Sequence, residues 1–191
     1  MVLIIGITGA TGAIYGIRLL EVLSKIEVVE THVIISKSGE ETIKYETDYE
    51  PNDVRALANF TYEIDDIGAS LSSGSFQRDG MIIAPCTVKT MSALANSYAE
   101  NLIIRAGDVS LKERKPLVLV VRETPLHLGH LRSMAQLTEM GAIIFPPVPS
   151  FYNKPKAIDD IINSTIGRVL DLFNIEHNLS YRWSGLATTE G

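Results

Sequence analysis

The sequence is short of cysteine, of long apolar runs and of positive charge, and each scarcity excludes or disfavours a class of protein. Cys86 is the single cysteine, so an intrachain disulfide and a Cys-x-x-Cys metal pair are both excluded. The apolar runs, such as residues 117–121, fall far short of the ~20 residues that span a bilayer. A net charge of −6 disfavours a general nucleic-acid binder, which needs a basic surface. We therefore expect neither a membrane nor a nucleic acid as partner.

Short apolar segments alternate with helical patterns along the 191 residues. This alternation predicts an α/β fold, a Rossmann-like three-layer sandwich with a mostly parallel central sheet. We expect one domain over residues 1–174 and a C-terminal tail over 175–191. The N-terminus runs directly into the first apolar segment without the basic region of a signal peptide, so a cytoplasmic location is expected. The strands are predicted at 2–7, 32–35, 81–84, 117–121 and 142–145, and the helices after Gly12 and at 38–45, 51–58, 87–97, 128–140 and 158–169.

The turn after the first predicted strand reads Gly6-Ile7-Thr8-Gly9-Ala10-Thr11-Gly12. Glycines between a strand and a helix let the backbone approach a phosphate, and the free N–H groups of the helix start point at the anion. The spacing GxxGxxG does not match the GxGxxG of dinucleotide-binding folds. A phosphate cradle is the favoured interpretation, and a turn needed only for close packing is the alternative.

Two further junctions place polar groups at the same edge of the predicted sheet. The second strand ends in Ser36-Lys37-Ser38, without the acidic residue that binds a ribose in NAD-dependent folds, which leaves a mononucleotide or NADP. The third junction reads Ala84-Pro85-Cys86-Thr87-Val88-Lys89-Thr90, and we interpret Cys86 as a buried thiol. Arg122 and Glu123 follow the strand 117–121 and so lie on the ligand side of the sheet. The segment 65–78 is rich in Ser, Gly and Asp and predicts a mobile loop.

Several long segments resemble the flavin prenyltransferases of the UbiX type. They read GITGATGAIYGIRLL, VIISKSG, APCTVKTMSALA, NLIIRAGDVSLKERKPLVLVVRETPL, FPPVPSFYNKP and a closing RW, and together they extend from about residue 3 to residue 185. The resemblance implies transfer of a dimethylallyl group from dimethylallyl phosphate to N5 and C6 of reduced FMN, without a metal ion. It also implies a UbiD-type decarboxylase as recipient of the prenylated FMN, and a homo-oligomer, in relatives a dodecamer. The sequence leaves open whether the donor is a monophosphate or a diphosphate.

The resemblance also assigns roles to individual residues. Glu123 is implied as the catalytic acid, Glu46 as a second active-site carboxylate, and Arg122 as a catalytic arginine beside both flavin and prenyl phosphate. Tyr152 and Arg168 are implied as ligands of the prenyl phosphate, and Lys112 and Arg105 are implied to have a related role in binding this substrate. The pattern more often has Ser at position 11 and Gly at position 89. The implied FMN contacts are Gly9, Ala10, Thr11, Ser36, Thr87, Val88, Lys89, Thr90, Arg122 and Trp183.

Three other functions fit parts of the pattern. An FMN-dependent cysteine decarboxylase would need a histidine near the first helix, where this chain has Tyr15. A non-catalytic flavin carrier would need neither the Arg122–Glu123 pair nor a second phosphate site. An NADP-dependent reductase of the epimerase type shares the GATG turn, but its YxxxK motif needs a continuous helix, and Pro155 lies between Tyr152 and Lys156.

Overall fold

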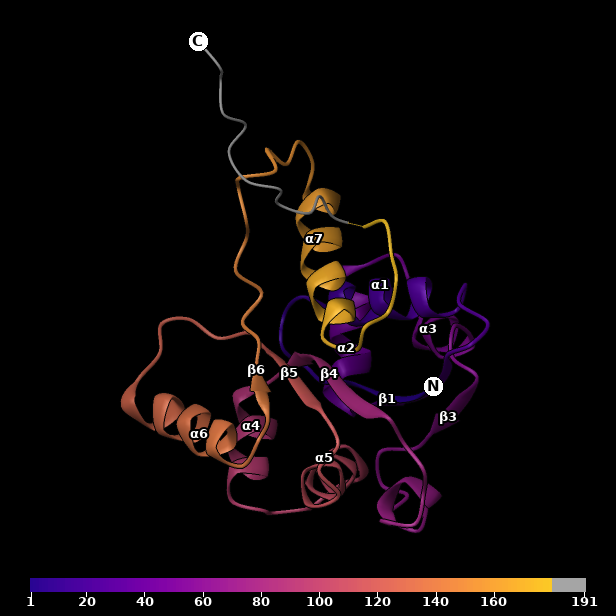
Figure 1. Cartoon of the computed structure of the whole chain (residues 1–191), viewed down its shortest axis with the longest axis vertical. Coiled ribbons are helices and arrows are strands. Elements are labelled where there is room, and N and C mark those ends of the chain that lie inside the picture. Colours follow the sequence, from indigo (N-terminus) through magenta and orange to yellow (C-terminus); the bar gives the residue numbers. More distant parts are fainter. Residues whose placement is uncertain (180–191) are drawn as a thin grey trace. The chain divides into compact units, whose positions relative to one another are not determined.

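The computed structural model describes residues 1–179, and the chain divides into two compact units, Met1–Pro147 and Val148–Gly191. The first unit contains a six-stranded sheet with the order β3-β2-β1-β4-β5-β6, in which every neighbouring pair is parallel (Figure 1). This architecture confirms the predicted Rossmann-like α/β class. The division into a domain 1–174 and a tail stays a prediction. The strands are β1 (Val2–Ile7), β2 (Glu30–Ile35), β3 (Phe60–Tyr62), β4 (Gly80–Cys86), β5 (Leu117–Val121) and β6 (Ile143–Ile144).

Helices connect the strands of the first unit, and one long helix lies in the second. The helices of the first unit are α1 (Ala13–Leu23), α2 (Lys37–Glu46), α3 (Pro51–Ala56), α4 (Val88–Ala95), α5 (Leu102–Lys112) and α6 (Leu128–Glu139), with a short 3-10 helix η1 (Ser70–Ser72). The second unit contains α7 (Ile158–Asp171). Among the residues that the structure describes, no helix is long and apolar enough to cross a membrane.

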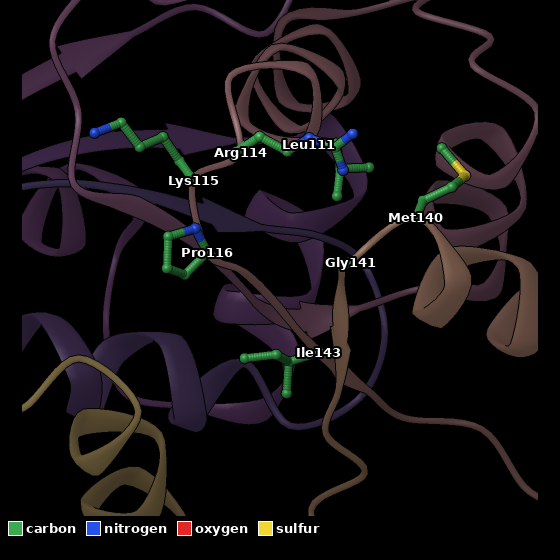
Figure 2. A pocket seen from close by; sticks show the side chains of 7 residues that line it. All are labelled: Leu111, Arg114, Lys115, Pro116, Met140, Gly141 and Ile143. Atoms are coloured by element: carbon green, nitrogen blue, oxygen red, sulfur yellow. The ribbon is translucent and has the colours of Figure 1, made fainter.

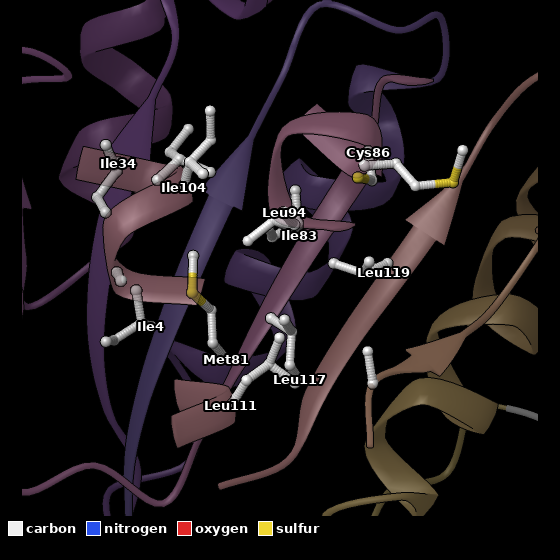
Figure 3. Packing of buried hydrophobic residues seen from close by; sticks show 14 of the residues in the cluster. Ile4, Ile34, Met81, Ile83, Cys86, Leu94, Ile104, Leu111, Leu117 and Leu119 are labelled. Atoms are coloured by element: carbon white, nitrogen blue, oxygen red, sulfur yellow. The ribbon is translucent and has the colours of Figure 1, made fainter. Parts of the chain in front are cut away.

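The central strands are apolar throughout because helices bury both of their faces. On one face, Ile4 and Met81 of the sheet belong to a buried cluster with Leu94 of α4 and Ile104 of α5 (Figure 3). On the other side α1 packs so closely on β4 that a Cβ at Gly16 would lie 2.3 Å from the backbone oxygen of Ala84. This close packing holds the starts of the two helices α1 and α4 in fixed positions beside the sheet.

The structure corrects the predicted elements at three places. Strand β4 continues through Pro85 to Cys86, and the proline is tolerated because the pairing with β5 is irregular between Ile83 and Cys86. The sequence analysis did not predict β3 or α5. The segment 65–78 is anchored rather than loose: Leu71 is fully buried, and the buried guanidinium of Arg78 donates to backbone oxygens of Leu71, Ser73 and Ala106.

Candidate active site

The turn between β1 and α1 depends on one glycine conformation and on a carboxylate from another helix. Gly12 has a φ of 96°, a left-handed conformation that favours glycine, and as the N-cap residue it has no side chain to cap α1. Oε2 of Glu46, at the end of α2, accepts hydrogen bonds from the N–H groups of Gly12 at 2.7 Å and Ala13 at 3.2 Å. The structure thus brings Glu46, an expected active-site carboxylate, to the glycine turn.

Gly9 is needed for close packing of the same turn against α2. A Cβ at this position would lie 2.5 Å from both Cβ and Oγ of Ser38, closer than non-bonded atoms approach. The packing interpretation, which the sequence left open, therefore applies to Gly9. This close contact places the glycine turn beside Ser36 and Ser38, the two serines that follow β2.

The ends of β2 and β4 carry their own capping hydroxyl groups. Oγ of Ser36 accepts a hydrogen bond from the N–H of Gly39 at 3.0 Å and caps α2. Oγ1 of Thr87 accepts from the N–H of Thr90 at 3.1 Å and caps α4. Hydroxyl groups and helix N–H groups therefore gather at the carboxyl edge of the sheet, where ligands bind in open α/β folds.

Thr8 links the junction between β1 and α1 to the junction between β4 and α4. Its side chain is 2% exposed; Oγ1 donates to the backbone oxygen of Pro85 at 2.7 Å and accepts from the N–H of Thr87 at 2.9 Å. Both hydrogen-bonding functions of the hydroxyl are used within the protein. Thr8 is therefore a positioning residue.

Arg122 and Glu123 complete this edge at the end of β5. The N–H of Arg122 donates to the backbone oxygen of Cys86 at 3.3 Å, which ties the end of β5 to the end of β4. The Arg122 side chain is exposed, and within residues 1–179 its guanidinium has neither a hydrogen-bond nor an ion-pair partner. Oε1 of Glu123 accepts from the N–H of Thr124 at 3.0 Å. The structure thus places a free cation and a carboxylate beside the flavin contacts expected from the sequence.

Two further expected cations of the first unit already have partners. Arg105 of α5 donates to the backbone oxygen of Ser72 at 3.1 Å and pairs with Asp108 at 3.0 Å. Lys112 ends α5 just before β5 begins, at the amino edge of the sheet, and its ammonium contacts Glu113. The hydrogen bond from Lys112 lowers the pKa of the Glu113 carboxyl. Within one subunit, Lys112 is therefore not brought to the glycine turn.

The second unit holds two of the expected prenyl-phosphate ligands. Arg168 lies in the last turn of α7, and Nη1 pairs with Oδ2 of Asp171 at 2.8 Å. The Tyr152 side chain is 51% exposed and precedes α7. Trp183 lies outside the described residues.

A polar cavity of about 350 Å³ opens at the carboxyl edge between the starts of α2, α4 and α5. Ser36 and Lys89, two of the expected flavin contacts, lie in its wall. The wall also holds Asp65, Glu100 and Asn101, which the sequence analysis missed. Asn101 precedes the apolar residues 102–104, a typical N-cap position, and it could have revealed α5.

A second cavity, of about 250 Å³, lies at the opposite, amino edge of the sheet (Figure 2). Its wall contains the side chains of Leu111, Pro116, Met140 and Ile143. It lacks the capping hydroxyl groups that the carboxyl edge provides. The wall residues are Leu111, Arg114, Lys115, Pro116, Met140, Gly141 and Ile143.

Cys86 is fully buried, and burial raises the pKa of its thiol far above the usual range. A thiol in this state is not a nucleophile. This agrees with the interpretation of Cys86 as a buried thiol from the sequence. Among the described side chains, no group of three or more His, Cys, Asp and Glu residues is placed to hold a metal ion.

Comparison with known proteins gives one consistent result. The family model described as Flavoprotein matches residues 1–170. Flavin prenyltransferase UbiX of Thauera aromatica is 56% identical over 185 residues, which are 97% of this chain and 95% of the relative.

Two solved structures have the same fold along nearly the whole chain. AnUbiX (PadA1) in complex with FMN and dimethylallyl pyrophosphate has a TM-score of 0.95 at 51% identity, covering 96% of this chain and 97% of its own. A dodecameric FMN-dependent UbiX-like decarboxylase from Escherichia coli O157:H7 has a TM-score of 0.95 at 49% identity, covering 97% and 100%. The chain described here therefore belongs to the flavoprotein family and, within it, to the flavin prenyltransferases of the UbiX type.

Proposed function

We propose that this protein transfers a dimethylallyl group from dimethylallyl phosphate to reduced FMN at the carboxyl edge of its sheet. The observation that carries the proposal is the guanidinium of Arg122, which has no partner within residues 1–179 and follows β5 beside the hydroxyl-lined ends of β2 and β4. A free cation at such an edge attracts an anionic ligand. The product, prenylated FMN, is passed to a decarboxylase of the UbiD type, and the reaction takes place in the cytoplasm.

The flavin is held by the three strand-to-helix junctions. Ser36, Thr87 and Thr90 offer hydroxyl groups, and Oγ1 of Thr87, which donates to Oγ1 of Thr90 at 3.0 Å, turns from that partner to the ligand. The first turns of α2 and α4 offer N–H groups with the positive end of a helix dipole. The backbone of Gly9, Ala10 and Thr11 borders the same site, with Val88 and Lys89 in the first turn of α4. The order β2-β1-β4-β5 separates Ser36 from Arg122 by three strand spacings, roughly 14 Å. This span suits a flavin whose phosphate lies near β2 and whose ring extends toward β5.

The prenyl donor needs cations because the departing phosphate carries away the electron pair of the broken C–O bond. N5 of reduced FMN replaces the phosphate at the allylic carbon and releases its proton, which gives the new C–N bond. C6 then bonds to the substituted carbon of the prenyl double bond, which becomes electrophilic when the neighbouring alkene carbon takes up a proton, and C6 releases its own proton as the new C–C bond forms. Arg122 binds the phosphate through its planar fork, which suits phosphate oxygens, and Tyr152 and Arg168 of the second unit act with it. Glu123, next to Arg122, transfers a proton to the phosphate oxygen, and Glu46 moves the proton that C6 releases. Trp183 completes the surroundings of the ring.

The position of Lys112 supports an assembly of several copies. Lys112 lies at the amino edge of its own sheet, so it reaches a prenyl phosphate only from a neighbouring subunit, and Arg105 of the same helix acts from there too. The exposed side chains of Leu126, Leu128 and Leu131 give the start of α6 an apolar surface that an assembly would cover. We therefore include a homo-oligomer, a dodecamer like the relative from Escherichia coli, in the proposal.

The test is anaerobic incubation of the protein with reduced FMN and dimethylallyl phosphate, followed by mass spectrometry of the flavin. We expect a flavin whose mass is increased by one dimethylallyl unit, with no added metal ion and in the presence of a chelator. A parallel reaction with dimethylallyl diphosphate identifies the donor. FMN that binds without gaining mass with either donor would contradict the proposed transfer and leave a flavin carrier.

Glu123→Gln separates binding from chemistry. We expect this variant to bind FMN normally and to form product about 100-fold more slowly, the usual cost of losing a general acid. Glu139→Gln, an exposed substitution at the end of α6, is the matched control and should keep the parent rate. A Glu123→Gln protein that reacts at the parent rate would remove Glu123 from the mechanism.

A further inference from the structure

Three polar side chains at the end of α7 are linked, and the proposed chemistry uses only the outermost of them. Nη1 of Arg168 lies 2.8 Å from Oδ2 of Asp171, and Oδ1 of the same carboxylate lies 3.2 Å from Nε2 of His177. Asp171 therefore joins a guanidinium that is proposed to bind the prenyl phosphate to an imidazole in the segment after the helix. All three residues belong to the second unit.

The chain reverses after α7, and this reversal brings His177 back to the helix. Asn174 has a φ of 55°, a left-handed conformation that asparagine adopts more readily than most residues. The N–H of Ile175 donates to the backbone oxygen of Leu170 at 3.2 Å, and the Ile175 side chain is buried. The position of the imidazole beside Asp171 is therefore determined by the way in which the helix ends.

Burial decreases along the three linked side chains. The side chain of His177 is 2% exposed, that of Asp171 is 17% exposed and that of Arg168 is 60% exposed. The buried imidazole thus holds the carboxylate, and the carboxylate restrains an exposed guanidinium. Apart from the contact of Nη1 with Asp171, this guanidinium has no hydrogen-bond or ion-pair partner within residues 1–179, so its other N–H groups are available to a phosphate.

The imidazole has a defined tautomer because its two nitrogens have partners of opposite kinds. Nδ1 lies 3.2 Å from the backbone nitrogen of Leu179, whose N–H can only donate, so Nδ1 accepts. In the neutral ring Nε2 then carries the proton and donates to Oδ1 of Asp171. Nε2 of His177 therefore orients the carboxylate, whereas Nδ1 serves only the backbone at Leu179.

We propose that Asp171 and His177 are positioning residues that hold Arg168 ready for the phosphate of the prenyl donor. The inference rests on the proposed function, because it assumes that Arg168 binds this phosphate. An arginine that is already restrained loses less conformational freedom on binding, so the restraint increases the affinity for the donor. This ordering is needed equally for the bound donor and for the transition state, so its loss changes KM and leaves kcat unchanged.

The first experiment breaks each link and measures the kinetics of transfer from dimethylallyl phosphate to reduced FMN. We expect Asp171→Asn and His177→Asn each to raise KM for the donor about tenfold and to keep kcat within about twofold. An amide at position 171 cannot accept from both Arg168 and His177, and an asparagine at position 177 is too short to replace Nε2.

Glu176→Gln is the matched control for the change of charge. Glu176 is exposed and lies in the wall of a cavity that Arg168 and Asp171 also line. Its substitution removes one negative charge, as Asp171→Asn does, but breaks no contact with Arg168. Removing a negative charge near an anion does not weaken binding of that anion, so KM for the donor should not rise in this variant.

The second experiment separates positioning from a structural role. His177→Gln places an amide N–H near the position of Nε2 and loses the acceptor for Leu179, so KM for the donor should stay within about threefold of the parent value. In the background of Arg168→Ala, His177→Asn should change this KM by less than about twofold, because the group that it positions is absent. FMN affinity, followed by flavin fluorescence, should remain that of the parent in every variant and shows that each one is folded.

Two results would overturn the inference while prenyl transfer by the parent protein leaves the proposed function intact. One is an unchanged KM for the donor in Asp171→Asn, which alone decides the question if His177→Asn binds FMN poorly. The other is an equal effect of His177→Asn in the parent and in the Arg168→Ala protein. A parent protein that binds FMN and transfers no prenyl group would overturn both the inference and the proposed function.

Discussion

The junctions β1–α1 and β4–α4 lie side by side at the edge of the sheet, and the helix that follows each junction is capped in a different way. The first uses glycines, and its helix is capped by the carboxylate of Glu46 from another helix. The second contains no glycine, and its helix is capped by the hydroxyl of its own Thr87. An anion at the first junction competes with a carboxylate, whereas at the second junction the cap is a neutral hydroxyl group. The comparison teaches that a glycine-rich turn alone does not show where the charge of a ligand will lie.

Gly16→Ala should have the largest effect on the free energy of unfolding, because the added methyl group pushes apart the two elements, α1 and β4, that carry the two junctions. The added Cβ would lie 2.3 Å from the backbone oxygen of Ala84 and 2.9 Å from Cδ1 and Cγ1 of Ile7, so α1 must move away from β4. We expect the free energy of unfolding to fall by about 3 kcal/mol, measured by urea denaturation. Gly68→Ala is the control, since its nearest contact, at 3.4 Å, is a side-chain oxygen of Asp66. Equal stability of the two variants would contradict this close packing.

Thr8→Val should have the next largest effect, because it removes the hydroxyl that joins the junctions while keeping the shape of the side chain. The N–H of Thr87 loses its buried acceptor, and the backbone oxygen of Pro85 loses a donor. We expect a loss of about 2 kcal/mol in the free energy of unfolding. Thr8→Ser retains the hydroxyl and should recover most of this loss; failure to do so would mean that packing, and not the hydrogen bonds, explains the effect.

Thr87→Ala tests the cap that the second junction provides for itself. The N–H of Thr90 loses its acceptor, and we expect a loss of about 1 kcal/mol in the free energy of unfolding. FMN affinity should fall as well, since Thr87 is one of the proposed contacts. Thr87→Ser should restore both quantities, and a variant as stable as the parent protein would show that α4 does not depend on this cap.

Glu46→Gln should have the smallest effect, because the amide oxygen can still accept the two hydrogen bonds. Only the attraction between the negative charge and the start of α1 is lost, about 0.5 kcal/mol at low ionic strength. Urea denaturation at low and high salt measures this effect, which screening should remove. Glu41→Gln, on the same helix, is the control. A loss that persists at high salt would contradict a charge effect.

The fold could be predicted where a single periodicity dominated the sequence. The residues of β1 from Leu3 to Ile7 and all of β5 are buried, and their continuous apolar runs were recognised. Strand β3 was missed because two of its three residues are exposed. Helix α5 was missed because eight of its eleven residues are buried, which hides the alternation of apolar and polar faces. The anchoring of segment 65–78 depends on Arg78, whose buried position arises only from tertiary packing.

The site could be predicted as far as chain order determines it. Strand ends in a parallel sheet meet at one edge, so the proximity of Ser36, Thr87 and Arg122 followed from the strands alone. The contact between Glu46 and Gly12 did not, because it depends on how α2 packs beside α1. Nor could the ion pairs that Glu100 and Asp65 make with lysines in the cavity wall be foreseen, since Glu100 lies in a segment without a recognised pattern and Asp65 begins the segment that was predicted to be a mobile loop.

A crystal structure of the protein with FMN bound tests the central claim most directly. We expect the phosphate of FMN at the carboxyl edge, within hydrogen-bonding distance of Ser36 and Thr87, with the ring extending toward Arg122. Electron density for FMN at the amino edge, in the cavity walled by Leu111, Met140 and Ile143, would contradict the account.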